Sequence, residues 1–284
     1  MAKILDGRIV RDIIKRELSQ KIASFKVPPT LVIIQVGEKE ESNIYIKQKK
    51  IFGESVGAKV IHIEYPETVA EAVLIGEIKK LNEDKNIHGI ILQLPLPKKL
   101  HPEKIIENIN PQKDVDGMTG FNLKLLMEGK NSGVMPATTR GIITLLDYYK
   151  VPIDGKTVVI VGRSALVGKP TALALLNRNA TVIICHTYTK DLAGETCGAD
   201  ILVVAIGNPE MIDEKFVGEG QVVIDVGISR VESVSGKIEV MGDVNLKDVE
   251  GKVEAISPVP GGVGPMTVVS LFQNLLDAYN MQTK

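Results

Sequence analysis

A tyrosine and a lysine stand four residues apart in the segment SNIYIKQKK, residues 42–50. In a helix that turns by about 100° per residue, the apolar Ile44, Ile51 and Phe52 fall on one arc, which we expect to be buried, and Tyr45 and Lys49 fall on a stripe at its edge. A lysine that is partly withdrawn from water and hydrogen-bonded by a phenol has a lowered pKa and can move a proton. The commoner alternative on helices is a lysine that lays its stem on the tyrosine and extends its ammonium group into water. The pair alone leaves both readings open.

A second candidate for chemistry is the glycine turn in VVIVGRSALVGKP, where Gly162 and Gly168 enclose five residues. A strand, a glycine turn and a helix start form the arrangement in which backbone N–H groups and the helix dipole receive a pyrophosphate. The spacing differs from the usual G-x-G-x-x-G, and a tight turn without any ligand would also use glycines. The turn therefore predicts a dinucleotide site, with a ligand-free turn as the alternative.

The type of dinucleotide depends on the end of the following strand. An NAD site carries an acidic residue there to bind the ribose hydroxyls, but this strand ends in CHTYT, residues 185–189, without a carboxylate. Arg163 follows the first glycine, and its guanidinium group could pair with a 2′-phosphate. These residues favour NADP over NAD, and the alternative for Arg163 is a solvated surface charge.

The elements that must position these residues form two series. In the first, the strands 30–36, 58–65 and 87–97 alternate with helices at 40–57 and 69–83. Such alternation predicts βαβ units and a parallel sheet. After a helix near 139–150 the alternation restarts in KTVVIVG, ATVIIC, ADILVVAIG and QVVIDVG. We expect a second α/β domain from about residue 140, and a last helix with Pro265 in its first turn.

Composition limits the setting and the partners. A chain of 284 residues with 44% hydrophobic content can bury two cores. Its 34 basic and 35 acidic residues leave a net charge of -1, which gives no indication of nucleic acid binding. No apolar run reaches the roughly 18 residues of a membrane span. Two cysteines without metal-ligand spacing suit a reducing cytoplasm, and the four histidines show no metal spacing either, so we predict no metal site.

The segment SNIYIKQKK resembles the S-x-x-Y-x-x-x-K segment of the bifunctional methylenetetrahydrofolate dehydrogenase/cyclohydrolase family. Further segments match that family in the same order and extend over nearly the whole chain. They are GIILQLPLP (89–97), PQKDVDG (111–117), GRSALVGKP (162–170), GDV (242–244) and SPVPGGVGPMT (257–267). The combination is far more specific than a nucleotide-binding fingerprint.

The resemblance implies that methylenetetrahydrofolate loses a hydride to NADP and that water then opens the methenyl cation to 10-formyltetrahydrofolate. It makes Lys49 the central catalytic group, with Tyr45 placing the folate, Gln93 bonded to Lys49, and Asp116 bound to the polar edge of the pterin. One-carbon metabolism and purine biosynthesis are the implied context. The implied substrate-binding residues are Tyr45, Lys49, Gln93, Leu94, Asp116, Pro260, Gly261, Gly262, Val263 and Gly264.

The same resemblance implies two domains with a cleft between them, and a homodimer formed through the nucleotide domain. The folate domain is expected at 1–139 plus 265–284, and the Rossmann-like NADP domain at 140–264. The implied cofactor-binding residues are Thr138, Gly162, Arg163, Ser164, Val167, Gly168, Thr187, Gly207 and Ile228.

Alternatives and departures remain. Gln93 alone could cap a strand end, and Asp116 alone could stabilise a turn. Where the family reads Pro-Cys-Thr-Pro, this chain has Ala137 and Thr139 around a retained Thr138, and a threonine replaces the usual serine at 187. The competing functions are a dehydrogenase of similar architecture for another small substrate, of the shikimate or amino-acid type, and a non-catalytic folate- or nucleotide-binding protein.

Overall fold

The structure, a computed structural model, describes residues 1–232 and 238–283. The chain divides into two compact units, which we call the three-stranded unit (Ile13–Ala137 and Val268–Lys284) and the six-stranded unit (Met1–Asp12 and Thr138–Thr267). The chain passes from one unit to the other inside three helices: α1 (Gly7–Ala23), α6 (Ala137–Tyr148), after its first residue, and α10 (Val263–Gln282). The predicted α/β class with two α/β parts is confirmed, and Pro265 lies in the first turn of α10 as predicted.

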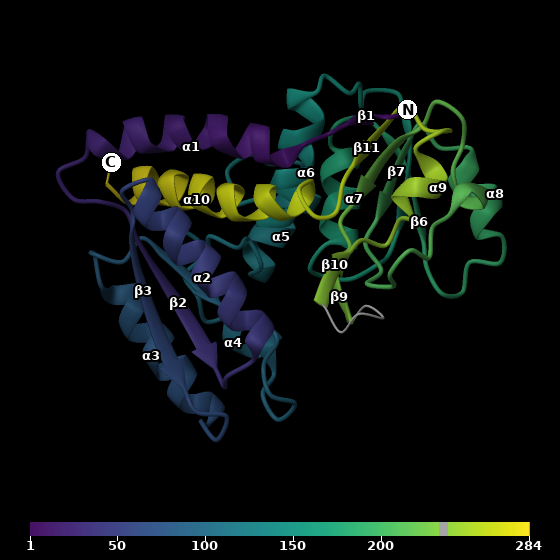
Figure 1. The fold of residues 1–284 in the computed structure, drawn as a ribbon. Coiled ribbons are helices and arrows are strands. Elements are labelled where there is room, and N and C mark those ends of the chain that lie inside the picture. Colours follow the sequence, from purple (N-terminus) through teal and green to yellow (C-terminus); the bar gives the residue numbers. More distant parts are fainter. Residues whose placement is uncertain (233–237, 284) are drawn as a thin grey trace. The chain divides into compact units, whose positions relative to one another are not determined.

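The three-stranded unit contains a parallel sheet in the order β3-β2-β4. Figure 1 shows α2 and α3 flanking these strands. All seven residues of β2 are buried, because helices cover both faces of a parallel sheet and leave no polar side. The elements are β2 (Thr30–Val36), α2 (Glu40–Ser55), β3 (Lys59–Tyr65), α3 (Glu71–Glu83) and β4 (Gly89–Leu92).

Alternate residues of β2 are buried on opposite faces of the sheet, in two different hydrophobic cores. Val32, Ile34 and Val36 pack with Leu74 and Ile78 of α3 in one cluster. On the other face Leu31 and Ile33 are also fully buried. There the rings of Phe52 and Phe272 approach to 5.2 Å between centroids, which brings α2 and α10 together. The sheet therefore holds α2, the helix of Tyr45 and Lys49, at a fixed position.

The segment after β4 is held by two buried charged residues. The Lys113 ammonium group donates to the carbonyl oxygens of Leu81 and Asp84, at 3.0 and 2.7 Å, and so satisfies the end of α3. Asp114 Oδ2 accepts hydrogen bonds from the Thr119 amide at 2.7 Å and from Asn122 Nδ2 at 2.9 Å. These bonds fix the start of the helix α5 (Gly120–Met127); the short helix α4 (Pro102–Ile106) precedes it.

The six-stranded unit has a fully parallel sheet in the order β1-β11-β8-β7-β5-β6. A separate antiparallel pair of strands, β9 and β10, lies outside it. The elements are β1 (Lys3–Ile4), α6 (Ala137–Tyr148), β5 (Thr157–Val161), α7 (Gly168–Leu176), β6 (Thr181–Cys185), α8 (Leu192–Cys197), β7 (Ile201–Val204), η1 (Glu214–Phe216), β8 (Val222–Asp225), β9 (Ser229–Glu232), β10 (Ile238–Met241), α9 (Leu246–Val249) and β11 (Ala255–Ser257).

The N-terminal segment belongs to a different unit from the one expected. The prediction placed residues 1–139 together, whereas Met1–Asp12 group with the six-stranded unit. The physical reason is a strand pairing: Lys3 and Ile4 of β1 pair with Ala255 and Ile256 of β11 at the edge of the large sheet. A two-residue strand carries no periodicity, so its partner cannot be read from its sequence.

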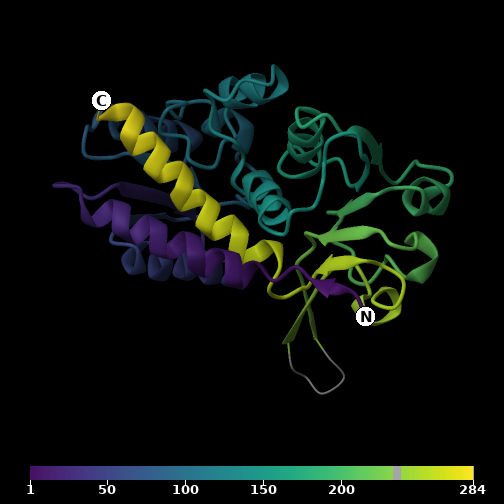
Figure 2. The same cartoon turned by 90° about the horizontal axis from the view of Figure 1, so that it is seen from above.

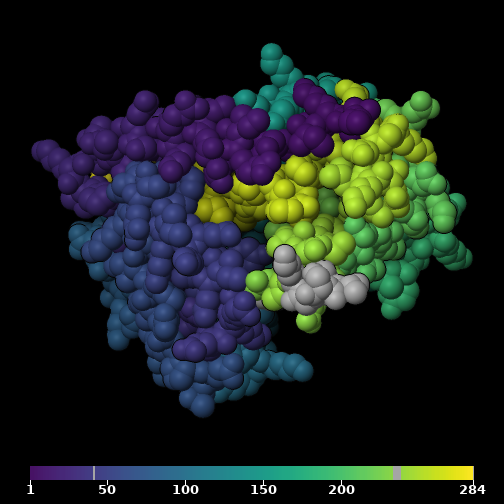
Figure 3. Space-filling model, viewed as in Figure 1, coloured from purple at the N-terminus to yellow at the C-terminus, as the bar shows by residue number. Residues whose placement is uncertain are grey.

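Helices α1 and α10 lie side by side in both ribbon views (Figures 1 and 2). The space-filling view shows α1 overlying α10 (Figure 3). Just past the end of α1, the Phe25 ring stacks on Tyr279 of α10 with centroids 4.6 Å apart. Among the described residues, no helix is long and apolar enough to cross a membrane.

Candidate active site

The buried face of α2 differs from the predicted arc. Ile51, expected in the core, is 57% exposed, whereas Ile46 and Phe52 are buried. Gly53 explains this orientation of the helix: a Cβ atom there would lie 2.4 Å from Cγ2 of Val60 and 2.9 Å from the Phe272 ring, so α2 packs closely against β3 and α10 at this glycine. The side of α2 that carries Lys49 and Gly53 therefore faces the rest of the protein.

Lys49 is half-buried, and its ammonium nitrogen donates a hydrogen bond of 2.9 Å to Gln93 Oε1. Gln93 lies directly after β4, where its backbone amide donates to the Ile34 carbonyl at 2.8 Å and so continues the sheet pairing. Its side-chain amide donates to the Leu94 carbonyl at 2.7 Å, which leaves Oε1 facing the lysine. The backbone thus fixes the glutamine that receives the lysine. Tyr45, one turn earlier on α2, is 37% exposed.

Asp116 provides the opposite charge near Lys49. Desolvation lowers the pKa of Lys49, and the attraction of Asp116 partly opposes this change. Desolvation also raises the pKa of Asp116, with Lys49 opposing and Asp114 reinforcing the rise. Both side chains remain half-buried, so solvent still reaches them. A lysine and a carboxylate that are each shifted toward the neutral form suit proton transfer and the binding of polar substrate groups.

The two aspartates of DVDG have different surroundings. Asp114 is 1% exposed, and its carboxylate is bonded to α5. Among the described residues, no protein group donates a hydrogen bond to the carboxylate of Asp116. Asp114 therefore holds the loop in place, whereas the carboxylate oxygens of Asp116 remain available as acceptors.

The glycine turn joins β5 to α7 in the six-stranded unit. Gly162 has φ of 125°, in the region that favours glycine. A Cβ at Gly168 would lie 2.2 Å from the Gly162 carbonyl oxygen, so only glycine permits this close approach of helix and strand. Ser164 Oγ accepts the amides of Val167 and Gly168 at 3.1 and 3.3 Å, which shapes the turn. The turn and the N-terminus of α7 fit a pyrophosphate.

The end of β6 carries no carboxylate, as the sequence indicates. Gly162 donates its amide to the Cys185 carbonyl at 2.9 Å, so this strand end lies beside the glycine turn. Thr187 and Arg163 are both exposed there. The Arg163 guanidinium carbon lies 5.7 Å from the centre of the Tyr188 ring, a cation–π contact that was not predicted.

Two further predicted cofactor residues follow neighbouring strands. Sequence order reverses around β5, with β6 on one side and β7 on the other, and ligands bind parallel sheets at such a switch point. Gly207 follows β7 with φ of 67°. Ile228 follows β8, is 42% exposed, and its Cδ1 would lie 3.5 Å from a Cβ added at Gly264. The structure thus brings Ile228 to the loop that begins α10.

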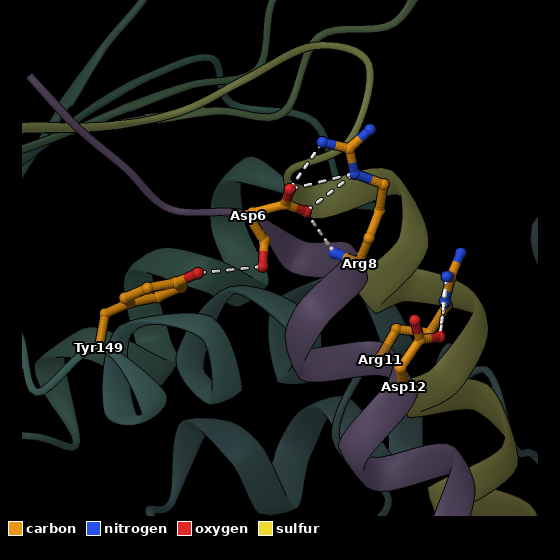
Figure 4. Close-up of polar contacts among 5 residues, drawn as sticks. All are labelled: Asp6, Arg8, Arg11, Asp12 and Tyr149. Atoms are coloured by element: carbon orange, nitrogen blue, oxygen red, sulfur yellow. Dashed lines mark hydrogen bonds and ion pairs between the residues drawn. The ribbon is translucent and has the colours of Figure 1, made fainter.

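That loop, Pro260–Gly264, is backed by the N-terminal segment. Gly7 donates its amide to the Gly261 carbonyl at 2.9 Å. The Arg8 guanidinium Nε would lie 3.2 Å from a Cβ added at Gly261, and Asp6 holds Arg8 through two side-chain nitrogens (Figure 4). Tyr149 donates its hydroxyl to the Asp6 carbonyl at 3.1 Å. These contacts, all within the six-stranded unit, fix the glycine-rich backbone.

The residues that depart from the family pattern begin α6. Ala137 and Thr139 are both buried, and Thr139 Oγ1 lies 3.2 Å from Thr171 Oγ1 on α7. Thr138 is half-buried, and its hydroxyl accepts from Thr267 at 3.4 Å. Thr139 therefore connects α6 with the helix that begins at the glycine turn.

Two buried aspartates were missed by the sequence analysis. Asp225 at the end of β8 and Asp243 after β10 are 3% and 0% exposed. The sequence signals were weak: Asp225 precedes Gly227 by two positions, and Asp243 follows Gly242 in the matching segment GDV, to which no role was assigned. Their contacts are described below.

These features define a class of protein: a two-part α/β protein with a dinucleotide-type glycine turn and a lysine–glutamine–aspartate group. Residues 5–116 match the family described as tetrahydrofolate dehydrogenase/cyclohydrolase, catalytic domain, and residues 136–283 match the NAD(P)-binding domain of the same family. The chain belongs to the tetrahydrofolate dehydrogenase/cyclohydrolase family.

Individual relatives match this chain over nearly their whole length. A protein of Lactobacillus gasseri called "Bifunctional protein FolD" is 44% identical over 96% of this chain and 96% of its own. The crystal structure of the bifunctional enzyme FolD from Campylobacter jejuni is 40% identical, has a TM-score of 0.94, and covers 99% of this chain and 100% of its own. The enzyme of Trypanosoma brucei, solved with NADP cofactor and inhibitor, is 32% identical with a TM-score of 0.94, over 100% of this chain and 99% of its own.

Proposed function

We propose that this protein oxidises 5,10-methylenetetrahydrofolate with NADP and then hydrolyses the methenyl product to 10-formyltetrahydrofolate. Its membership of a dehydrogenase/cyclohydrolase family supports both activities. The observation that carries the proposal is the 2.9 Å hydrogen bond between Lys49 and Gln93, formed beside the carboxylate of Asp116. A dehydrogenase for another substrate, or a protein without catalysis, is not favoured.

In the hydrolytic step Lys49 is the group that moves the proton. Desolvation lowers the pKa of its amine, so the neutral form is accessible at a lower pH than for an ordinary lysine. Gln93 Oε1 accepts one N–H and holds the amine in a single direction. Lys49 can then take a proton from the attacking water and return it as the ring opens. Tyr45, on the same helix, places the folate.

Asp116 binds the substrate and does not enter the chemistry. The pterin edge carries amino and ring N–H donors, which match the two acceptor oxygens of a carboxylate. Leu94, partly buried against the core of the three-stranded unit, gives an apolar neighbour. We also assign Pro260, Gly261, Gly262, Val263 and Gly264, at the start of α10, to substrate binding, since the three glycines leave backbone that a flat ring can approach.

The six-stranded unit holds the dinucleotide in this proposal. The tight approach of Gly168 to Gly162 and the exposed Arg163 fit a pyrophosphate and a 2′-phosphate. When bound, NADP accepts the hydride from the folate. The protein contributes placement, which is the main requirement of hydride transfer. The proposed cofactor residues are Thr138, Gly162, Arg163, Ser164, Val167, Gly168, Thr187, Gly207 and Ile228.

The proposal is tested by two assays on the purified chain. NADPH formation from methylenetetrahydrofolate measures the dehydrogenase, and the disappearance of added methenyltetrahydrofolate, corrected for its spontaneous hydrolysis, measures the cyclohydrolase. We expect both activities. A protein that binds folate and NADP but catalyses neither reaction would contradict the assignment.

We expect Arg163→Ala to weaken NADP binding while NAD binding stays nearly unchanged. The substitution removes a charge-assisted contact to the 2′-phosphate worth roughly 1.5 to 3 kcal/mol, or about 10- to 150-fold in affinity. The measurement is the dissociation constant of each dinucleotide by fluorescence titration. Lys169→Ala is the control, because it removes an exposed cation from the start of α7, directly after the same turn. An equal loss for NAD and NADP in Arg163→Ala would show that Arg163 does not discriminate between them.

A homodimer and a cytoplasmic location complete the proposal. The edge strand β6 of the six-stranded sheet supports the dimer, because its partly buried Val182 and Ile183 and its Ile184, 39% exposed, leave apolar surface beside unpaired backbone groups. Sedimentation velocity on the purified chain is expected to show a dimer, and a monomer at assay concentrations would contradict this. Purine biosynthesis is the proposed use of the formyl product.

A further inference from the structure

Asp225 and Asp243 are buried in the six-stranded unit, and the chemistry proposed above does not use them. They are 3% and 0% exposed, and each carboxylate accepts three backbone amides. A buried carboxylate is retained only where its hydrogen bonds compensate for lost hydration. The groups that these two carboxylates bind therefore indicate what they do.

Asp243 binds three consecutive amides of the loop after β7. Its Oδ2 accepts from Ile206 at 2.7 Å and from Gly207 at 3.0 Å, and its Oδ1 accepts from Asn208 at 2.8 Å. Successive amides that converge on one anion form a concave nest. This carboxylate thereby fixes the backbone around Gly207, at the carboxyl end of the sheet next to the glycine turn.

Asp225 fixes the segment that carries Asp243. Its Oδ1 accepts from the amides of Gly227 and Asp243, both at 3.0 Å, and its Oδ2 accepts from Val244 at 3.0 Å. Gly227 directly precedes Ile228 in the chain. The Asp225 carboxylate therefore holds two backbone segments. One leads into Ile228, and the other carries Asp243.

Two glycines leave the space that the carboxylates need. A Cβ at Gly227 would lie 2.1 Å from Cγ of Asp243. A Cβ at Gly242 would collide with the carboxylate of Asp225. Each carboxylate is therefore closely packed against a glycine of the segment that carries the other.

We propose that Asp243, supported by Asp225, is a positioning residue for the dinucleotide: it holds the loop of Gly207, while Asp225 holds the segment of Ile228, in the form that receives the cofactor. This inference rests on the proposed function, because Gly207 and Ile228 are cofactor residues only in that proposal. Both aspartates are buried, and they act on these two segments through backbone hydrogen bonds. Their loss is therefore expected to act on cofactor affinity through the shape of the two loops.

The test is the variant Asp243→Asn, which keeps the shape but places an amide donor against backbone donors. We expect KM for NADP and the dissociation constant of NADPH to rise about tenfold or more, with kcat of the dehydrogenase at saturating NADP close to that of the unaltered protein. The cyclohydrolase, which consumes no NADP, is measured in the same preparation and is expected to change less than about twofold. Because burial raises the pKa of Asp225 to about 7, the assays are run about one pH unit above that value.

Asp248→Asn is the matched control, since Asp248 is exposed on α9, a few residues further along the chain. Unchanged NADPH affinity in folded Asp243→Asn would overturn the inference, and so would a parallel loss of both activities, which would show a purely structural role. If Asp243→Asn does not fold, Asp225→Asn decides by the same measurements, with a smaller rise in KM expected. A failure of the proposed function is recognised by a different result: the unaltered protein itself would show no NADP-dependent oxidation.

Discussion

Lys49→Met is expected to reduce the cyclohydrolase rate by about 10²- to 10⁴-fold, the usual loss for a general acid-base group. Methionine keeps the length and apolar stem of the lysine but can neither hold nor release a proton. Gln93 would lose the N–H that it accepts at 2.9 Å. Proton movement in water attack and ring opening would then have no carrier on the protein side.

The dehydrogenase of the same variant should retain a larger share of its rate. Hydride transfer needs the folate and the dinucleotide aligned, and an ammonium group does not help a developing cation. Methenyltetrahydrofolate should therefore accumulate. The measurement follows NADPH formation and methenyl disappearance separately in the purified variant.

Lys47→Met is the matched control, because Lys47 lies on the same helix and is exposed. Its two rates should be those of the unaltered protein. In the unaltered protein, the lowered pKa of Lys49 should place the lysine-dependent limb of the cyclohydrolase pH profile below the ordinary lysine range. Unimpaired methenyl hydrolysis in Lys49→Met would show that Lys49 only extends into solvent and that another group carries the proton.

Asp116→Asn is expected to weaken folate binding by about 10²- to 10³-fold and to affect both reactions together. The amide has nearly the same shape, but one acceptor oxygen becomes a donor that faces pterin donors, and charge-assisted hydrogen bonds of about 1.5 to 3 kcal/mol each are lost. Equilibrium titration with a folate ligand measures the effect. NADP affinity should stay unchanged.

The first aspartate of the same motif, Asp114, provides the contrast. Asp114 accepts from Thr119 and Asn122 inside the protein, so Asp114→Asn should lower the free energy of unfolding by about 1 to 3 kcal/mol while folded protein binds folate normally. The two variants change the same residue type two positions apart. Wild-type folate affinity in Asp116→Asn would remove Asp116 from the site.

Much of the candidate site follows from local pattern. The tyrosine and the lysine stand one helical turn apart, so one helix is enough to place them on neighbouring positions, and the structure has that helix at Glu40–Ser55. The glycine turn likewise lies between β5 and α7, as the change from strand to helix periodicity predicts. The wrong expectation for Ile51 arose because a helical wheel gives the relative angles of side chains but not which angle faces the core. Gly53 decides that direction through its contacts with Val60 and Phe272.

By itself, the sequence determined two series of alternating strands and helices, the strand end without a carboxylate, and the placement of Lys49 at an apolar edge. These properties depend on neighbours within a few residues, where helix and strand periods fix which side chains share a face. Only the tertiary structure decided the contacts between distant segments: Gln93 reaches Lys49 across 44 positions, and Asp243 reaches the amides of residues 206–208 across 35 to 37. The same holds for β1, which pairs with β11 and so joins the N-terminus to the six-stranded unit. Such contacts depend on which buried surfaces and unpaired backbone groups complement each other in the folded chain, and no local period encodes that choice.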